Sequence, residues 1–148
     1  MNFEKRVLAA RKEMRELFPA TPLQLNSYLS QLYGAEVYLK REDLSPVRSY
    51  KIRGAFNAIR ISLYESPRVK EFVCASAGNH AQGVALACKK LKIKCNIVMP
   101  VTAPENKIKA VRRLKAKVTL YGENLSHALK KANEIEKENK YTFVHPFD

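Results

Sequence analysis

Two short segments of this chain carry residue types that could do chemistry. The first is Ser49-Tyr50-Lys51-Ile52-Arg53-Gly54, and the second is Ser76-Ala77-Gly78-Asn79-His80-Ala81-Gln82-Gly83. If Ser49 caps a helix, Lys51 lies in its first turn, where the positive end of the helix dipole and the nearby Arg53 both favour the neutral amine. A neutral lysine amine attacks carbonyls to form Schiff bases. The alternative is a solvated lysine on a helix face.

The second segment predicts a polar turn between a strand and a helix. Phe72-Val73-Cys74-Ala75 is expected to be the strand, and the turn from Ser76 onward opens the helix. Free backbone N–H groups at such a helix start bind carboxylates and phosphates, and Ser76 and Asn79 could add side-chain hydrogen bonds. Gly78 is expected to adopt a turn geometry closed to other residues. The alternative is a capped helix without a ligand.

The sequence disfavours three other kinds of site. Gly78 and Gly83 have the spacing of a nucleotide-binding loop, but Val84-Ala85 stand where that loop needs Lys and Ser or Thr. A G-x-G-x-x-G dinucleotide motif is also missing. The three histidines are too scattered to predict a metal site; they are His80, His127 and His145.

The order of elements predicts an α/β fold built on a parallel sheet with flanking helices. The N-terminal part should contain a helix over 2–18, an extended segment over 21–25, a helix over 27–33, a strand ending near Arg41 and a helix from Ser49 to about Leu63. Strands over 72–75, 94–99, 117–121 and 141–144 should then alternate with helices over 79–91, 105–114 and 124–139. Pro67 marks the expected boundary between two parts.

Composition limits the class of protein. The 148 residues carry a net charge of +13, but the basic residues are spread over the chain without an aromatic pattern, so a solvated surface is favoured over a nucleic-acid surface. No apolar run approaches the ~20 residues of a membrane span. Three cysteines without metal-type spacing, and an N-terminus without a targeting signal, favour reduced thiols and a cytoplasmic location.

Several motifs in sequence order make a specific resemblance. They are TPLQL at 21–25, VYLKRED at 37–43, PVRSYKIRGAFNAI at 46–59, CASAGNHAQGVA at 74–85, IVMPVTAP at 97–104, NKIKAVR at 106–112 and VHPFD at 144–148. Together they resemble the threonine ammonia-lyases (threonine dehydratases) of the tryptophan-synthase-β-like family of pyridoxal-phosphate (PLP) enzymes. The PVRSYK form is more similar to the biosynthetic type than to the catabolic type.

The resemblance implies a reaction and a set of roles. Lys51 would form the Schiff base with PLP and later move the α-proton of the substrate, while Tyr50 would lie against the cofactor ring and Asn79 would bind its 3′-hydroxyl. The substrate carboxylate would be held by Ser76, Gly78, Asn79 and His80. The reaction would convert L-threonine into 2-oxobutanoate and ammonia, at the head of isoleucine biosynthesis, and L-serine into pyruvate.

The resemblance also implies that the catalytic domain extends beyond this chain. Family members are longer, and the five glycines here do not form the glycine-rich loop that holds the PLP phosphate. Residues 1–66 are therefore expected to begin a large domain of fold type II, and residues 67–148 to form a small four-stranded domain, in an enzyme that is a homo-oligomer. The alternatives are a serine dehydratase or serine racemase, a non-catalytic α/β fragment, and a basic nucleic-acid-binding module.

Overall fold

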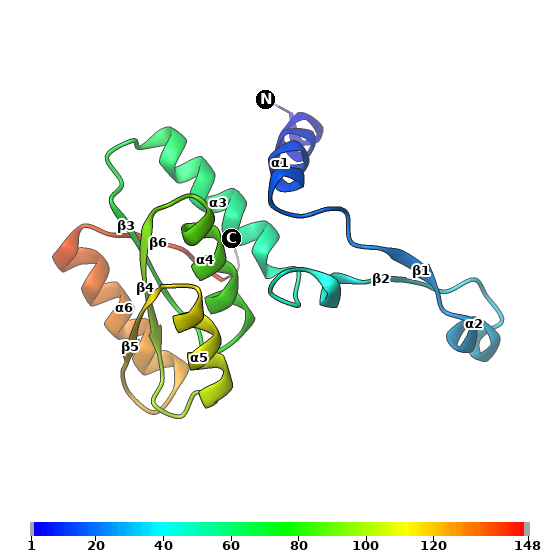
Figure 1. Cartoon of the computed structure of the whole chain (residues 1–148). Helices are drawn as coiled ribbons and strands as arrows, with labels where there is room; N and C mark the ends of the chain where they lie inside the picture. The colour runs from blue at the N-terminus through cyan, green and yellow to red at the C-terminus, as the bar shows by residue number, and fades with distance from the viewer. Residues whose placement is uncertain (1, 147–148) are drawn as a thin grey trace. The chain divides into compact units, whose positions relative to one another are not determined.

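The computed structural model describes residues 2–146, and the chain divides into two compact units, residues 1–50 and 51–148. The first unit runs from blue to cyan in Figure 1. Its elements are α1 (Phe3–Leu17), β1 (Leu23–Leu25), α2 (Ser27–Tyr33), β2 (Tyr38–Lys40) and a 3₁₀ helix over Glu42–Leu44. Strands β1 and β2 pair antiparallel, with Leu23 opposite Lys40 and Leu25 opposite Tyr38.

Local sequence signals set the helix boundaries of this first unit. The Oδ1 atom of Asn2 accepts from the backbone N–H of Lys5, and that of Asn26 accepts from Leu29, so both helices begin with a side-chain cap. Helix α2 ends at Gly34, which has a φ of 61°, the left-handed conformation that glycine adopts without steric cost.

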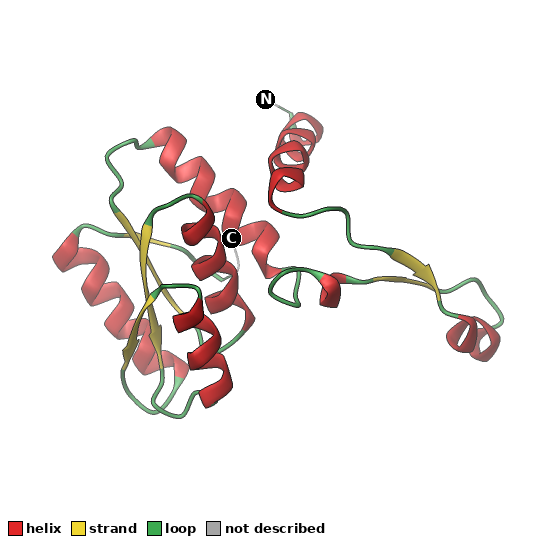
Figure 2. Ribbon diagram, viewed as in Figure 1, coloured by secondary structure: helices red, strands yellow, loops and turns green. Residues whose placement is uncertain are grey.

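The second unit is an α/β layer structure with four parallel strands in the order β5-β4-β3-β6 (Figure 2). Its elements are α3 (Lys51–Glu65), β3 (Glu71–Ala75), α4 (Asn79–Lys90), β4 (Lys94–Met99), α5 (Glu105–Arg113), β5 (Lys117–Leu120), α6 (Leu125–Asn139) and β6 (Thr142–Phe143). The predicted α/β class with a parallel sheet and flanking helices is confirmed.

Both faces of this sheet are covered by helices (Figure 1). Val73, Ala75 and Val98 pack against Ala128 and Ala132 of α6 on one face. Strand alternation turns the fully buried Phe72, Cys74 and Ile97 to the opposite face, which α4 covers. Each large apolar side chain buried in this way contributes about 1.5–3 kcal/mol.

Helix α4 is the central helix of the second unit, because it packs on β3 and β4 and also carries α3. Almost all of its residues from His80 to Cys88 are buried, and most of them are small. Because α3 packs on α4, the compact unit begins at Lys51 and not at the expected boundary near Pro67. The large-domain and small-domain assignment of residues 1–66 and 67–148 concerns a longer enzyme and stays a prediction.

Small differences from the predicted elements lie at their ends. The helix expected to start after a Ser49 cap begins at Lys51, so Lys51 does occupy the first turn. The last strand covers only Thr142–Phe143. Among residues 2–146, no helix combines the length and apolar character that a membrane crossing requires.

Candidate functional site

Gly83 brings the two chemically promising segments into contact. A Cβ atom added to Gly83 would lie 3.1 Å from both the carbonyl carbon and the carbonyl oxygen of Lys51, and 3.2 Å from the backbone nitrogen of Ile52. The absence of a side chain therefore lets α4 approach the first peptide group of α3. Since Gly83 lies about one helical turn after the start of α4 at Asn79, the backbone of Lys51 and the Ser76–His80 turn share one corner of the unit.

The Ser76–Gly78 turn is built at the carboxyl end of β3. The N–H of Ser76 donates to the carbonyl of Val98 at 3.1 Å, and its buried Oγ accepts from the N–H of Gly78 at 3.2 Å. Within the described residues, no side chain caps α4. The N–H groups of its first turn are thus available to an anion.

The backbone conformation of Gly78 agrees with the expected turn. Its φ of −142° and ψ of −133° lie outside the extended, right-handed helical and left-handed regions that residues with a side chain occupy. A Cβ atom at this position would meet no atom within 4 Å, so open space adjoins the backbone of Gly78 at the helix start. Glycine therefore suits both the turn and the open space beside it.

The segment Val144–Pro146 ties Lys51 and His80 to the same piece of backbone. The Nζ atom of Lys51 donates to the carbonyl oxygen of Pro146 at 2.7 Å. The buried ring of His80 places Nε2 at 3.0 Å from the carbonyl oxygen of Val144, and because a carbonyl only accepts, Nε2 carries the proton. The N–H of Val144 donates to Val73, which anchors the segment beside β3.

Sequence reasoning did not assign a role to these carbonyl groups, because backbone acceptors leave no signature in residue type. Residues 144–148 were grouped as a motif only in the resemblance, and residues 147–148 lie outside the described residues. The one available signal was the position of the motif directly after the last strand, at the same sheet edge as the Ser76 turn.

Asn79 and Tyr50 occupy more exposed positions. Asn79 is the first residue of α4, and its Oδ1 atom accepts from Nζ of Lys107 on α5 at 3.4 Å. Lys107 is a second cation that sequence reasoning missed. Tyr50 closes the first unit and is 60% exposed, and its role against a cofactor ring stays a prediction.

The charges around the turn favour an anionic ligand. The first turn of α4 contains no acidic residue, and its dipole places positive potential at Gly78 and Asn79. The ammonium group of Lys107 adds a cation at Asn79. Cys74, two residues before Ser76, is no competing nucleophile, because burial raises the pKa of its thiol and keeps it protonated.

A comparison with known protein families shows to which family this chain belongs. Residues 15–148 match the family described as "Pyridoxal-phosphate dependent enzyme". The chain belongs to this family. Its residues fit the cofactor, since Lys51 offers a primary amine to an aldehyde, while the uncapped start of α4 and the space beside Gly78 accept anionic groups.

Individual members of the PLP family show how far the similarity extends. The chain is 48% identical over 139 residues to the biosynthetic L-threonine dehydratase of Staphylococcus saprophyticus, covering 92% of this chain and 33% of that protein. The structure of threonine deaminase isoform 2 from Solanum lycopersicum matches with a TM-score of 0.82 at 43% identity, over 88% of this chain and 36% of that one. Serine racemase from Dictyostelium discoideum matches with a TM-score of 0.86 at 35% identity, over 97% and 47%. The chain thus spans about a third of the length of the curated relatives it matches.

Proposed function

We propose that this chain carries the lysine and the carboxylate-binding turn of a biosynthetic threonine dehydratase, which converts L-threonine into 2-oxobutanoate and ammonia for isoleucine biosynthesis. The observation that carries the proposal is the contact of Gly83 with the backbone of Lys51. This contact holds the amine-bearing residue beside an uncapped helix start, and the 48% identity to a biosynthetic L-threonine dehydratase supports the substrate.

Lys51 is assigned the covalent and proton-transfer roles. The bound cofactor supplies the electron sink that lets the α-proton of an amino acid be removed. The Lys51 amine first acts as a nucleophile and then, once free, takes the α-proton as a general base. For either step Nζ must leave the carbonyl of Pro146, so that hydrogen bond holds the resting side chain.

The turn is assigned the binding roles. We assign the substrate carboxylate to Ser76, Gly78, Asn79 and His80, at the positive end of the helix dipole. The Gly78 N–H would exchange its hydrogen bond to Ser76 Oγ for the carboxylate, which would also release the Ser76 hydroxyl. The Asn79 side chain would bind the 3′-hydroxyl of the cofactor, and Tyr50 would contact its ring. The His80 ring positions the turn through its hydrogen bond to the carbonyl of Val144.

A serine racemase or serine dehydratase is the second candidate. It is favoured by the match to the Dictyostelium serine racemase structure over 97% of this chain. The lysine and the turn bind the parts that threonine and serine share, so they do not separate the two substrates. We assign the cytoplasm and a homo-oligomer to the active enzyme as parts of the same proposal.

Borohydride trapping tests this proposal. The chain is incubated with PLP and reduced, and the modified peptides are mapped by mass spectrometry, with Lys51→Ala and the exposed control Lys12→Ala alongside. We expect one adduct, at Lys51, that Lys51→Ala removes and Lys12→Ala retains. Labelling spread over many lysines and unchanged in Lys51→Ala would refute it. Production of 2-oxobutanoate from threonine, or of D-serine from L-serine, then separates the two candidate substrates.

A further inference from the structure

The amino-terminal ends of the parallel strands lie at the edge of the sheet opposite the candidate site, and this edge has an unusual repeat of basic residues. Three of the helix-to-strand turns have a cation on either side of one half-buried apolar residue. These turns are Arg68-Val69-Lys70 before β3, Lys92-Ile93-Lys94 entering β4 and Lys115-Ala116-Lys117 entering β5. Because parallel strands all begin at the same edge, the three turns lie together there.

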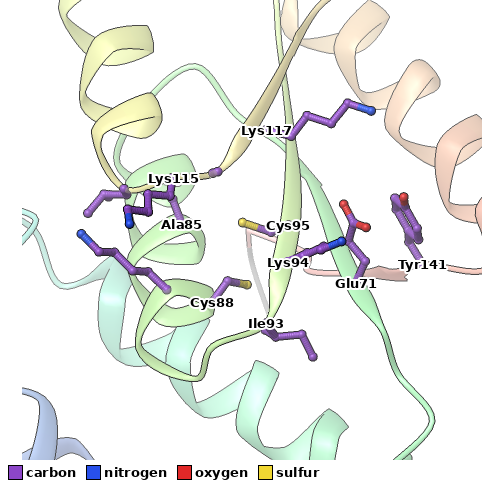
Figure 3. A pocket seen from close by; sticks show the side chains of 12 residues that line it. Glu71, Ala85, Cys88, Ile93, Lys94, Cys95, Lys115, Lys117 and Tyr141 are labelled. Atoms are coloured by element: carbon purple, nitrogen blue, oxygen red, sulfur yellow. The ribbon is translucent and has the colours of Figure 1, made fainter.

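Two adjoining cavities open at this edge, with volumes of ≈ 530 and ≈ 620 Å³. They share Glu71, Ile93, Lys94 and Tyr141, and their size suits a small molecule. Cys88 and Cys95 line the first cavity, and Lys94 and Lys115 contribute to the same lining (Figure 3).

The lining of these cavities is strongly positive. Eight cations contribute to it, namely Arg68, Lys70, Lys89, Lys92, Lys94, Lys115, Lys117 and Lys140. Among the described residues, none of the eight forms an ion pair within 4 Å. The single carboxylate in the two linings belongs to Glu71. With eight cations and one carboxylate, the lining has a positive potential that would attract an anion.

Backbone conformation shows that lysine is costly at this edge. Lys92, Lys115 and Lys140 have φ values of 56°, 65° and 57°, the left-handed positions after α4, α5 and α6 where glycine is usual. Helix dipoles account for one cation at each helix end. They do not account for Lys94 and Lys117, which begin strands. We therefore take the positive charge to be the reason that lysine occupies these turn and strand positions.

We propose that this amino-terminal edge of the sheet is a second binding site, which takes a compact anion bearing several phosphates. A concave site of this volume fits a triphosphate or a nucleoside triphosphate. An extended nucleic acid would need a row of cations and stacking aromatic residues, and Tyr141 is the one aromatic residue in the two linings.

The test is an NMR titration of the full chain with inorganic triphosphate and with ATP at about 0.15 M salt, where weak surface attraction is screened. We expect saturable amide shifts at 92–94 and 115–117 and none at 76–80. Competition between the two ligands, and which binds more tightly, distinguishes the inorganic from the nucleotide source. Absence of saturation, or shifts confined to 76–80, would overturn the proposal.

A double variant keeps this test independent of folding. Lys92→Gly/Lys115→Gly removes two charges at positions that suit glycine, so the fold is retained, and we expect affinity for triphosphate to fall at least about tenfold. Lys5→Ala/Lys12→Ala removes the same net charge from exposed positions of α1 and should leave the affinity unchanged. Equal weakening in both pairs, or tighter binding of a DNA duplex with shifts extending to α1, would mean a general attraction to polyanions and refute the site.

Discussion

Gly83 lies against the peptide group that joins Lys51 to Ile52, close enough that any side chain would displace it. We expect Gly83→Ala to lower the free energy of unfolding by no more than ~2 kcal/mol, since overpacking costs about 1–3 kcal/mol and alanine recovers about 1 kcal/mol in a helix interior. Its effect should appear instead in the position of Lys51.

Labelling of Lys51 by PLP and borohydride measures that displacement. It should fall in Gly83→Ala and fall further in Gly83→Val, whose larger side chain moves α3 more. Urea unfolding of both variants shows whether the fold persists. Undiminished labelling in folded Gly83→Val would show that the Lys51 backbone does not depend on this contact.

His80 holds the turn to the segment after β6. We expect His80→Phe to lower the free energy of unfolding by about 1–3 kcal/mol, because the buried carbonyl of Val144 loses its donor. The exposed His127 provides a control, and His127→Gln should change stability by no more than about 0.5 kcal/mol. Equal effects in the two variants, measured by urea unfolding, would count against the buried hydrogen bond.

Two left-handed turns predict opposite responses to substitution. Gly122 has a φ of 66°, and a Cβ atom there would lie 2.2 Å from the Cβ of His127, so Gly122→Ala should destabilise the fold by more than ~2 kcal/mol. Lys115 already bears a side chain at a φ of 65°, so Lys115→Gly should stabilise it by about 0.5–1 kcal/mol. Thermal unfolding compares the two; a loss of stability in Lys115→Gly would contradict the assigned strain.

The buried thiols give the protein a pH dependence in mildly alkaline solution. Burial raises the pKa of Cys74, and a hydrogen bond with Cys95 together with burial raises that of Cys88. The folded state keeps protons that the unfolded state releases above about pH 8.5, so the stability is complete below that pH and falls as pH rises toward the folded pKa.

The slope should reach about 1.4 kcal/mol per pH unit for each thiol. Urea unfolding between roughly pH 7.5 and 9.5 measures it, within the range where lysine stays protonated. Cys74→Ala/Cys88→Ala serves as the comparison, because its other titrating groups are unchanged. If the free energy of unfolding of this variant has the same slope against pH as that of the original chain, the fold does not keep the two thiols protonated.

Elements with local signals could be predicted from the sequence. The helix over 27–33 follows from Asn26 before it and Gly34 after it, and the parallel sheet follows from alternation of apolar strands with helical segments. The end of the last strand and the start of α3 were less defined, because pairing and packing partners set them.

In the candidate site, too, some features have a local sequence signal and others depend on tertiary packing. Lys51, Ser76 and Asn79 could be chosen by residue type and position. The carbonyl groups of Val144 and Pro146 could not, since backbone acceptors are identical at every residue. Gly83 was named within the Ser76–Gly83 segment, but its contact with Lys51 could not be predicted, because α3 is distant in sequence.

Strand β3 connects the two edges of the sheet, with Glu71 at its first position and Ser76 just past its last. Five extended residues measure roughly 16 Å, which is about two Debye lengths at physiological ionic strength. Charges placed at the two edges are therefore screened from each other by the surrounding electrolyte. A phosphate compound at one end and an amino-acid carboxylate at the other would not compete, and each would bind as though the other were absent.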